Sequence, residues 1–138
     1  MSVVFKDFTK IVLDKIQETG ETFLEEVGGE IESQTKRNTK VDTGKTKNSW
    51  EHVVNTDKME VQIGSRYKNA LWEELGTGIY ALNGDGRKTK WVYRTEDGKF
   101  HATVGKKPRR ALYRAFESKK NLIIREARRR FKELLQRF

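Results

Sequence analysis

The amino-acid sequence predicts an α+β fold: two long helices packed on a small antiparallel β-sheet built from hairpins, with a long mobile loop. Apolar residues recur at helical spacing near both ends of the chain, which is typical of amphipathic helices with one buried face. Between them, short stretches alternate apolar and polar residues and are separated by turn sequences, as in β-hairpins. One layer of helices on one layer of sheet buries both apolar faces.

The first predicted helix extends from the beginning of the chain toward Thr35. Gly28 and Gly29 interrupt its pattern, and each interior glycine costs about 1 kcal/mol relative to alanine. We therefore expect a kink or a break at this pair. The apolar face of the helix is formed by Val4, Phe8, Ile11, Val12, Ile16, Phe23, Val27 and Ile31.

The last predicted helix is opened by Pro108, because proline's missing N–H costs nothing at the first helical position. It extends for about seven to eight turns at 3.6 residues per turn. Its apolar residues lie three, four or seven positions apart: Leu112, Phe116, Ile123, Ala127, Phe131, Leu134 and Phe138.

Two hairpins are predicted in the middle of the chain. Residues 49–54 and 59–63 form the first, because both segments are β-prone and the second alternates strictly. Residues 91–94 and 100–104 form the second, across an Asp97-Gly98 turn.

A short helix and a glycine-rich loop are predicted between these hairpins. Residues 67–75 suit a helix that ends at Gly76, since glycine favours the position after a helix C-terminus. Residues 76–90 contain four glycines and little periodicity. We expect a mobile loop there, and such loops often carry function.

Composition excludes several classes of protein. The 138 residues suit one domain, residues 1–138. The chain has no cysteine, which excludes disulfides, thiolate zinc sites and a cysteine nucleophile. The longest apolar run has only four residues and the N-terminus has no apolar signal core, so we expect no membrane partner and synthesis in the host cytoplasm.

The motifs that suggest nucleotide or metal binding are incomplete. Gly44-Lys45-Thr46 is like the end of a phosphate-binding loop, but position 39 is Thr where that motif requires Gly. The single carboxylate within residues 83–86 cannot supply the six or more oxygen ligands of a calcium ion. We therefore expect no cofactor and no metal.

No catalytic constellation is present in the sequence. His52 and His101 fall in predicted strands and have no nucleophile or ligand spacing beside them, so we expect ordinary sheet positions. Glu73 and Glu74 are neighbours on a helix and point in different directions, which favours cap or interface roles. The protein is not expected to be an enzyme.

Charge is distributed unevenly along the chain, whose net charge is +9. Residues 1–34 carry three basic and eight acidic side chains, whereas residues 105–138 carry thirteen basic and three acidic ones. Either the two ends pair, within a subunit or between subunits, or the basic end faces a polyanion such as DNA. A third interpretation is a solvated helix face that keeps the protein soluble.

Several motifs, taken in order, resemble one family over roughly residues 30 to 118. The family is the minor tail-component family of lambdoid and related siphophages, whose members are neck or tail-completion proteins. The motifs are Val41-Asp42-Thr43-Gly44, Ala70 with Glu74-Leu75-Gly76-Thr77-Gly78, Trp91-Val92-Tyr93, Asp97-Gly98-Lys99-Phe100 and Ala115-Phe116-Glu117.

The resemblance implies a structural protein of the virion of a tailed phage or prophage, located at the head–tail junction. Family members are thought to form rings, often hexameric, that join the tail to the capsid and surround the DNA path. The implied partners are other copies of the chain, head-completion proteins, tail-tube or tail-terminator proteins, and genomic DNA bound without sequence specificity. In a closed ring, one surface of a subunit meets a different surface of its neighbour.

Two groups of residues are candidate contacts under this interpretation. The assembly interface is expected to include the turn, the helix end and the loop: Asp42, Thr43, Gly44, Glu74, Gly76, Thr77, Tyr80 and Arg87. Contacts to DNA or to an acidic neighbour are expected from the last helix and its entry: Arg109, Arg110, Arg114, Arg125, Arg128, Arg129 and Arg130.

An alternative function is sequence-independent nucleic-acid binding by the basic C-terminal helix. The excess of ten basic charges in residues 105–138 supports it. Glu126 and Glu133 interrupt the basic run, and the apolar stripe indicates that one face of the helix is buried. Steep salt dependence of DNA binding would distinguish this function from ring assembly.

Overall fold

The computed structural model describes residues 8–41 and 44–138. Its long helices and two small antiparallel hairpins confirm the predicted α+β class. The predicted interface residues Asp42 and Thr43 lie outside the described residues. In chain order, the elements are α1 (Thr9–Asn38), α2 (Lys45–Asn48), β1 (Trp50–Asn55), β2 (Glu60–Ser65), α3 (Lys68–Leu75), the 3₁₀ turn η1 (Gly78–Tyr80), β3 (Trp91–Arg94), β4 (Phe100–Thr103) and α4 (Ala111–Leu135).

Helix α1 is continuous over 30 residues, so the prediction of a kink or break at Gly28 and Gly29 is wrong. The first hairpin explains the glycine: a Cβ on Gly28 would lie 2.5 Å from His52 Cδ2 and 2.8 Å from Val61 Cγ2. At Gly20, eight positions earlier, a Cβ would overlap the end of the Met59 side chain in the same way. Close approach of the hairpin, and not a break, therefore accounts for these glycines.

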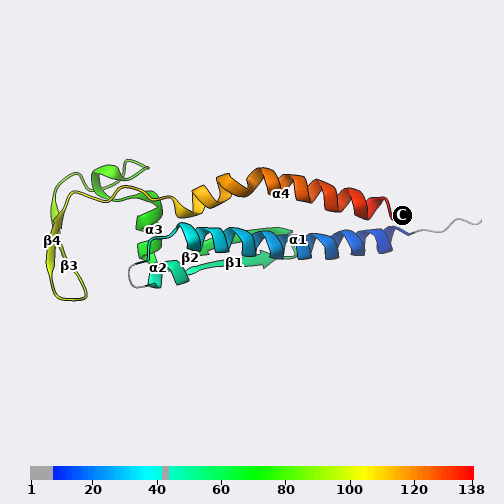
Figure 1. The fold of residues 1–138 in the computed structure, drawn as a ribbon, viewed down its shortest axis with the longest axis horizontal. Helices are drawn as coiled ribbons and strands as arrows, with labels where there is room; N and C mark the ends of the chain where they lie inside the picture. Colours follow the sequence, from blue (N-terminus) through cyan, green and yellow to red (C-terminus); the bar gives the residue numbers. More distant parts are fainter. Residues whose placement is uncertain (1–7, 42–43) are drawn as a thin grey trace, which may run out of the picture.

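Strands β1 and β2 form the antiparallel hairpin that covers one side of α1 (Figure 1). The register pairs His52 with Ile63 and Val54 with Val61 on the face toward the helix. Trp50, at the start of β1, is buried, and its indole N–H donates to the Thr39 hydroxyl at 3.0 Å. This bond satisfies the polar atom that burial of a tryptophan would otherwise leave unpaired.

Helix α4 runs antiparallel to α1 on another side of that helix (Figure 1). The Asn38 side-chain amide donates to the Ala111 carbonyl at 3.1 Å where α1 ends and α4 begins. Further along, Lys119 Nζ lies 2.8 Å from Glu30 Oε1. Helix α1 is thus the shared support for the first hairpin and for α4.

The second hairpin, β3 with β4, forms a separate two-stranded sheet. The expected single sheet is therefore two sheets, and β3–β4 lies at one end of the molecule, beyond α3 and away from the long helices (Figure 1). Glycine-lined backbone contacts between residues 77–79 and 104–106 fix its position. The first part of the predicted mobile loop, residues 76–82, is thereby held in place by hydrogen bonds.

Helix α4 begins at Ala111, three residues after the predicted start at Pro108. Residue Arg110 has left-handed φ and ψ angles of 55° and 44°, which end any helix that Pro108 could open. The Arg109 N–H donates to the Glu73 carbonyl at 2.7 Å. Residues 108–110 therefore pack along α3 before α4 begins.

Candidate assembly surfaces

Glu74 joins α3 to α4. Its carboxylate accepts hydrogen bonds from the backbone N–H of Leu112 at 3.0 Å and of Tyr113 at 2.9 Å. These N–H groups belong to the first turn of α4, where no intrahelical acceptor exists, and Arg110 supplies no side-chain cap. An anion there also complements the positive end of the helix dipole. Glu74 thus acts as the N-terminal cap of α4, within the subunit.

Glu73 fixes the segment that leads into α4. Arg109 Nε lies 3.5 Å from Glu73 Oε2, and Lys106 Nζ forms an ion pair with the same carboxylate. The Glu73 side chain is only 17% exposed, whereas both cations are far more accessible. Glu73 therefore holds residues 106–109 against α3, and Glu74 holds the first turn of α4, which follows directly.

Gly76 and Thr77 form the crossing point between α3 and the β4–α4 segment. Gly76 has a φ angle of 77°, and a Cβ there would lie 2.9 Å from the carbonyl oxygens of Lys106 and Tyr80. The Thr77 N–H donates to the Lys106 carbonyl at 2.9 Å, and the Lys106 N–H donates to Thr77 Oγ1 at 2.9 Å. The structure thus brings Glu74, Gly76 and Thr77 together, and each supports the subunit's own fold.

The other predicted interface residues are more accessible. Tyr80 is exposed, with Lys107 Nζ 5.8 Å from its ring centroid. Arg87 is exposed and its guanidinium lies 5.7 Å from the Trp91 ring centroid. Gly44, with a φ angle of 84°, precedes the short helix α2, which no sequence pattern predicted.

A cavity of about 710 Å³ lies between α3, the glycine-rich loop and the second hairpin. Its wall includes apolar and aromatic side chains, with Arg87 and Lys106 among the polar groups. The aromatic members are Trp72, Trp91 and Tyr93. Within residues 8–41 and 44–138, no group of three or more His, Cys, Asp or Glu could hold a metal ion.

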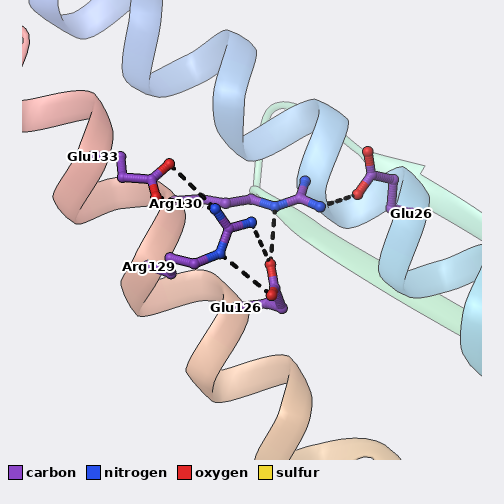
Figure 2. Close-up of polar contacts among 5 residues, drawn as sticks. All are labelled: Glu26, Glu126, Arg129, Arg130 and Glu133. Carbon is purple, nitrogen blue, oxygen red and sulfur yellow. Dashed lines mark hydrogen bonds and ion pairs between the residues drawn. The ribbon is translucent and has the colours of Figure 1, made fainter.

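The arginines of α4 differ in what they contact. The Arg129 guanidinium is shared by Glu126, at 2.8 Å, and Glu133, at 3.1 Å, along α4 itself, while Arg130 reaches Glu26 of α1 (Figure 2). Hydrogen bonding by Arg129 lowers the pKa of the Glu126 carboxyl. Arg129 and Arg130 are therefore occupied by carboxylates, which leaves them poorly placed for phosphate.

Arg125 and Arg128 are exposed and form no ion pair with any described residue. With Lys132 they lie on the side of α4 that faces away from α1, at helical spacing. We call these three residues the basic stripe. Arg114 instead reaches the end of α1: its Nε donates to the Arg109 carbonyl at 3.0 Å and its Nη2 donates to the Asn38 carbonyl at 3.5 Å. The Arg110 guanidinium stacks 3.7 Å from the Tyr113 ring centroid.

Helix α1 carries the opposite charge on the side that faces away from α4. Asp14, Glu18, Glu21 and Glu25 recur at intervals of four, three and four residues, so they share one face. Three of these side chains are exposed, and Glu21 is partly exposed. We call these four residues the acidic stripe. The prediction from the sequence concerned only the net charge of residues 1–34 and not this face. The spacing itself could have identified it.

His52 links the acidic side of α1 to the first hairpin. Its Nε2 lies 2.7 Å from Glu25 Oε1 and its Nδ1 lies 3.2 Å from Glu32 Oε1. The hydrogen bond to Glu25 raises the pKa of His52, against the opposing effect of burial. The sequence predicts an ordinary sheet position for His52, because no nucleophile or ligand spacing stands beside it, and its carboxylate partners lie 20 and 27 residues away.

In the part of the chain that the structure describes, no helix has the length and apolar character needed to cross a membrane. A family model described as "Bacteriophage HK97-gp10, putative tail-component" matches residues 5–81, more than half of the chain.

The chain therefore belongs to the HK97-gp10 family and is a structural tail component of a bacteriophage virion. This confirms the siphophage tail or neck family assignment made from the motif order. No curated protein and no solved structure matches the chain.

Proposed function

We propose that this protein is the ring-forming subunit of the head–tail junction, where it completes the tail, joins it to the capsid and surrounds the DNA path. Membership of a phage tail-component family supports a structural role in the virion. In this proposal residues 1–138 act as one domain without catalytic activity. The partners are copies of the chain, head-completion proteins, and tail-tube or tail-terminator proteins.

The observation that carries the proposal is the placement of the two charged stripes. The acidic stripe of α1 and the basic stripe of α4 face away from each other in one subunit, because the sides between them are joined by Arg130–Glu26 and Lys119–Glu30. The stripes therefore cannot pair within a subunit. Contact between two different surfaces of successive copies gives a ring when the rotation from one copy to the next closes, and opposite charge favours that register over like-with-like contact.

The loop and turn residues extend this interface. Gly44, Tyr80 and Arg87 lie on exposed or partly exposed segments near α2, α3 and the cavity. In this proposal they meet the neighbouring copy or an adjoining virion protein, and Glu74, Gly76 and Thr77 hold them in position. Genomic DNA passes through the ring and meets basic side chains without sequence readout.

Charge reversal tests the proposal. Asp14→Lys with Glu18→Lys reverses the acidic stripe, and Arg125→Glu with Arg128→Glu reverses the basic one. Each pair is expected to abolish self-association in sedimentation velocity at low salt, and all four changes together are expected to restore it. Lys58→Glu, in the exposed turn between β1 and β2, is the control for charge alone. A wild-type chain that stays monomeric at high concentration and low salt contradicts the proposal.

Sequence-independent nucleic-acid binding is the second candidate, and one observation favours it. Arg125 and Arg128 are exposed, and neither has a carboxylate partner among the described residues. Unpaired arginines three positions apart on one helix face can contact successive phosphates. The salt dependence of duplex binding separates this function from ring assembly.

A further inference from the structure

The outer face of the β3–β4 hairpin is apolar and uncovered. Val92 and Phe100 are 63% and 70% exposed, the highest values among the large hydrophobic side chains in the described part of the chain. The register pairs Val92 with Ala102 and Arg94 with Phe100, so all four lie on one face. The Arg94 guanidinium lies 5.6 Å from the Phe100 ring centroid. The opposite face, with Trp91 and Tyr93, lines the cavity.

The base of this hairpin is rigidly built. The Ile79 N–H donates to the Val104 carbonyl at 3.1 Å. Gly78 and Gly105 approach so closely that a Cβ on either one would overlap a backbone carbonyl of the other segment. At the tip, Lys45 Nζ lies 2.9 Å from Glu96 Oε1. A two-stranded hairpin is only marginally stable alone in water. The β3–β4 hairpin is held in one orientation by these contacts and has an apolar outer face, which is typical of a surface that binds another protein.

The charge around the outer face indicates what that partner offers. Residues 87–107 carry seven basic and two acidic side chains. Two such hairpins would repel one another, which disfavours contact between identical faces. The matching surface must combine an exposed apolar side chain with a carboxylate.

The outer face of the β1–β2 hairpin has this combination. An open recess of about 490 Å³ lies there, with Glu51, Val53, Gln62 and Gly64 in its wall. Val53 is 57% exposed, and nothing lies within 4 Å of the position of a Cβ on Gly64. Glu51 lies 3.4 Å from Arg66 Nε, but the Arg66 side chain is 93% exposed. Such an exposed pair contributes little, so Glu51 is open to a second cation.

We infer that the β3–β4 hairpin of one copy docks on the outer face of the β1–β2 hairpin of the next copy. Phe100 and Val92 cover Val53 and the Gly64 recess, and Arg94 pairs with Glu51. Two small sheets then pack face to face, at the usual separation of about 10 Å. The two surfaces differ, so the contact is heterologous. The inference rests on the proposed ring and specifies a second contact within it.

Cysteine cross-linking tests this contact, because the chain has no cysteine of its own. Ala102→Cys on the outer face of the β3–β4 hairpin and Gly64→Cys in the recess leave Phe100, Val92 and Val53 intact. Mild oxidation is expected to give covalent dimers and higher species from this double variant. Ala102→Cys with Val41→Cys is the control, since Val41 is 60% exposed and lies outside the recess. This control is expected to remain uncrosslinked.

A second pair of cysteines tests whether the β3–β4 hairpin docks instead on another exposed apolar surface. Ile11 and Leu13 are exposed near the start of α1, among charges of both signs. If Ala102→Cys cross-links to Leu13→Cys and not to Gly64→Cys, the inference is wrong. Rings that form while no Ala102–Gly64 bond appears overturn the inference but leave the proposed function standing. Monomers with no cross-link of any kind contradict both.

A charge exchange gives an independent readout. Arg94→Glu or Glu51→Arg alone is expected to weaken self-association by about tenfold, and the two changes together are expected to restore it. Lys58→Glu is the matched control, because it makes the same change of charge in the exposed turn between β1 and β2, outside the recess. Unfolding midpoints of the variants establish that each remains folded. Equal weakening by Arg94→Glu and by Lys58→Glu, without rescue by Glu51→Arg, overturns the proposed pairing.

Discussion

The carboxylate of Glu74 on α3 accepts a hydrogen bond from the backbone N–H of Tyr113, 39 residues later, at a distance of 2.9 Å. The same carboxylate also accepts the N–H of Leu112. We predict that Glu74→Ala lowers the free energy of unfolding by about 1–2 kcal/mol, the usual effect of losing a helix N-cap. Urea denaturation measures it. Glu117→Ala, which removes an exposed ion pair within α4, is the control, and an equal effect of both variants would refute the capping role.

The two adjacent glycines of α1 are predicted to respond oppositely to alanine. Gly29→Ala is expected to stabilise the protein by about 0.5–1 kcal/mol, because alanine favours a helix interior and its Cβ would lie 4.0 Å from the nearest atom, His52 Cε1. Gly28→Ala is expected to destabilise it by about 1–3 kcal/mol, because its Cβ would lie 2.5 Å from His52 Cδ2. Thermal and urea unfolding compare the two. Stabilisation by both would show that the hairpin does not pack closely on α1.

The His52 contacts predict a pH dependence of stability. The pKa of His52 is raised by Glu25, so its charged form stabilises the fold fully below about pH 6.5, its ordinary pKa, and this stability is lost as the pH rises through the folded value. Burial opposes ionisation of Glu32, but hydrogen bonds from His52 and the charge of Lys36 hold its pKa below the ordinary value. Its contribution is present above that ordinary value and is lost as the pH falls through the lowered one.

The measurement is the difference in free energy of unfolding between wild type and His52→Gln at about pH 5.5 and about pH 8.5. The difference is expected to be larger at the lower pH. A difference that is equal at both values, or larger at the higher pH, would show that His52 is not held by Glu25 and Glu32 as a cation.

Arg125 and Arg128 are predicted to dominate any binding of duplex DNA by α4. Substituting both by alanine is expected to weaken binding and to reduce the slope of log K against log salt by about 0.9 per lost phosphate contact. Arg129→Ala is the control, because Glu126 and Glu133 already occupy its guanidinium. Equal effects of Arg125→Ala and Arg129→Ala in salt titrations would contradict this assignment.

The spacing of apolar residues in the sequence allowed the helices and strands to be predicted, because apolar residues recur every three or four positions in a helix and every two in a strand. Tertiary contacts decided the rest. A Cβ on Gly28 would overlap the His52 side chain, so close packing of the hairpin requires a glycine inside a continuous helix, and no local signal in the sequence reports a partner 24 residues away. Helix α4 begins later than the predicted start at Pro108, because the Arg109 N–H donates a hydrogen bond to the Glu73 carbonyl on α3.

The candidate surfaces show the same division. The turn chemistry of Gly76 follows from local pattern and is found in the structure. Glu74 caps α4, whose N–H groups lie 38 and 39 residues later, so no local pattern could predict which helix it caps. The difference between Arg128 and Arg129 depends on where Glu126 and Glu133 lie, so a cluster of arginines in the sequence could not separate free from occupied side chains. Whether two hairpins share one sheet also depends on long-range packing alone.

Negative-stain imaging of the wild-type protein at low salt, together with its native mass, tests the central claim most directly. The account predicts closed rings of one subunit number, with a central opening wide enough for duplex DNA. A monomer under all conditions, or open filaments in place of closed rings, would contradict it.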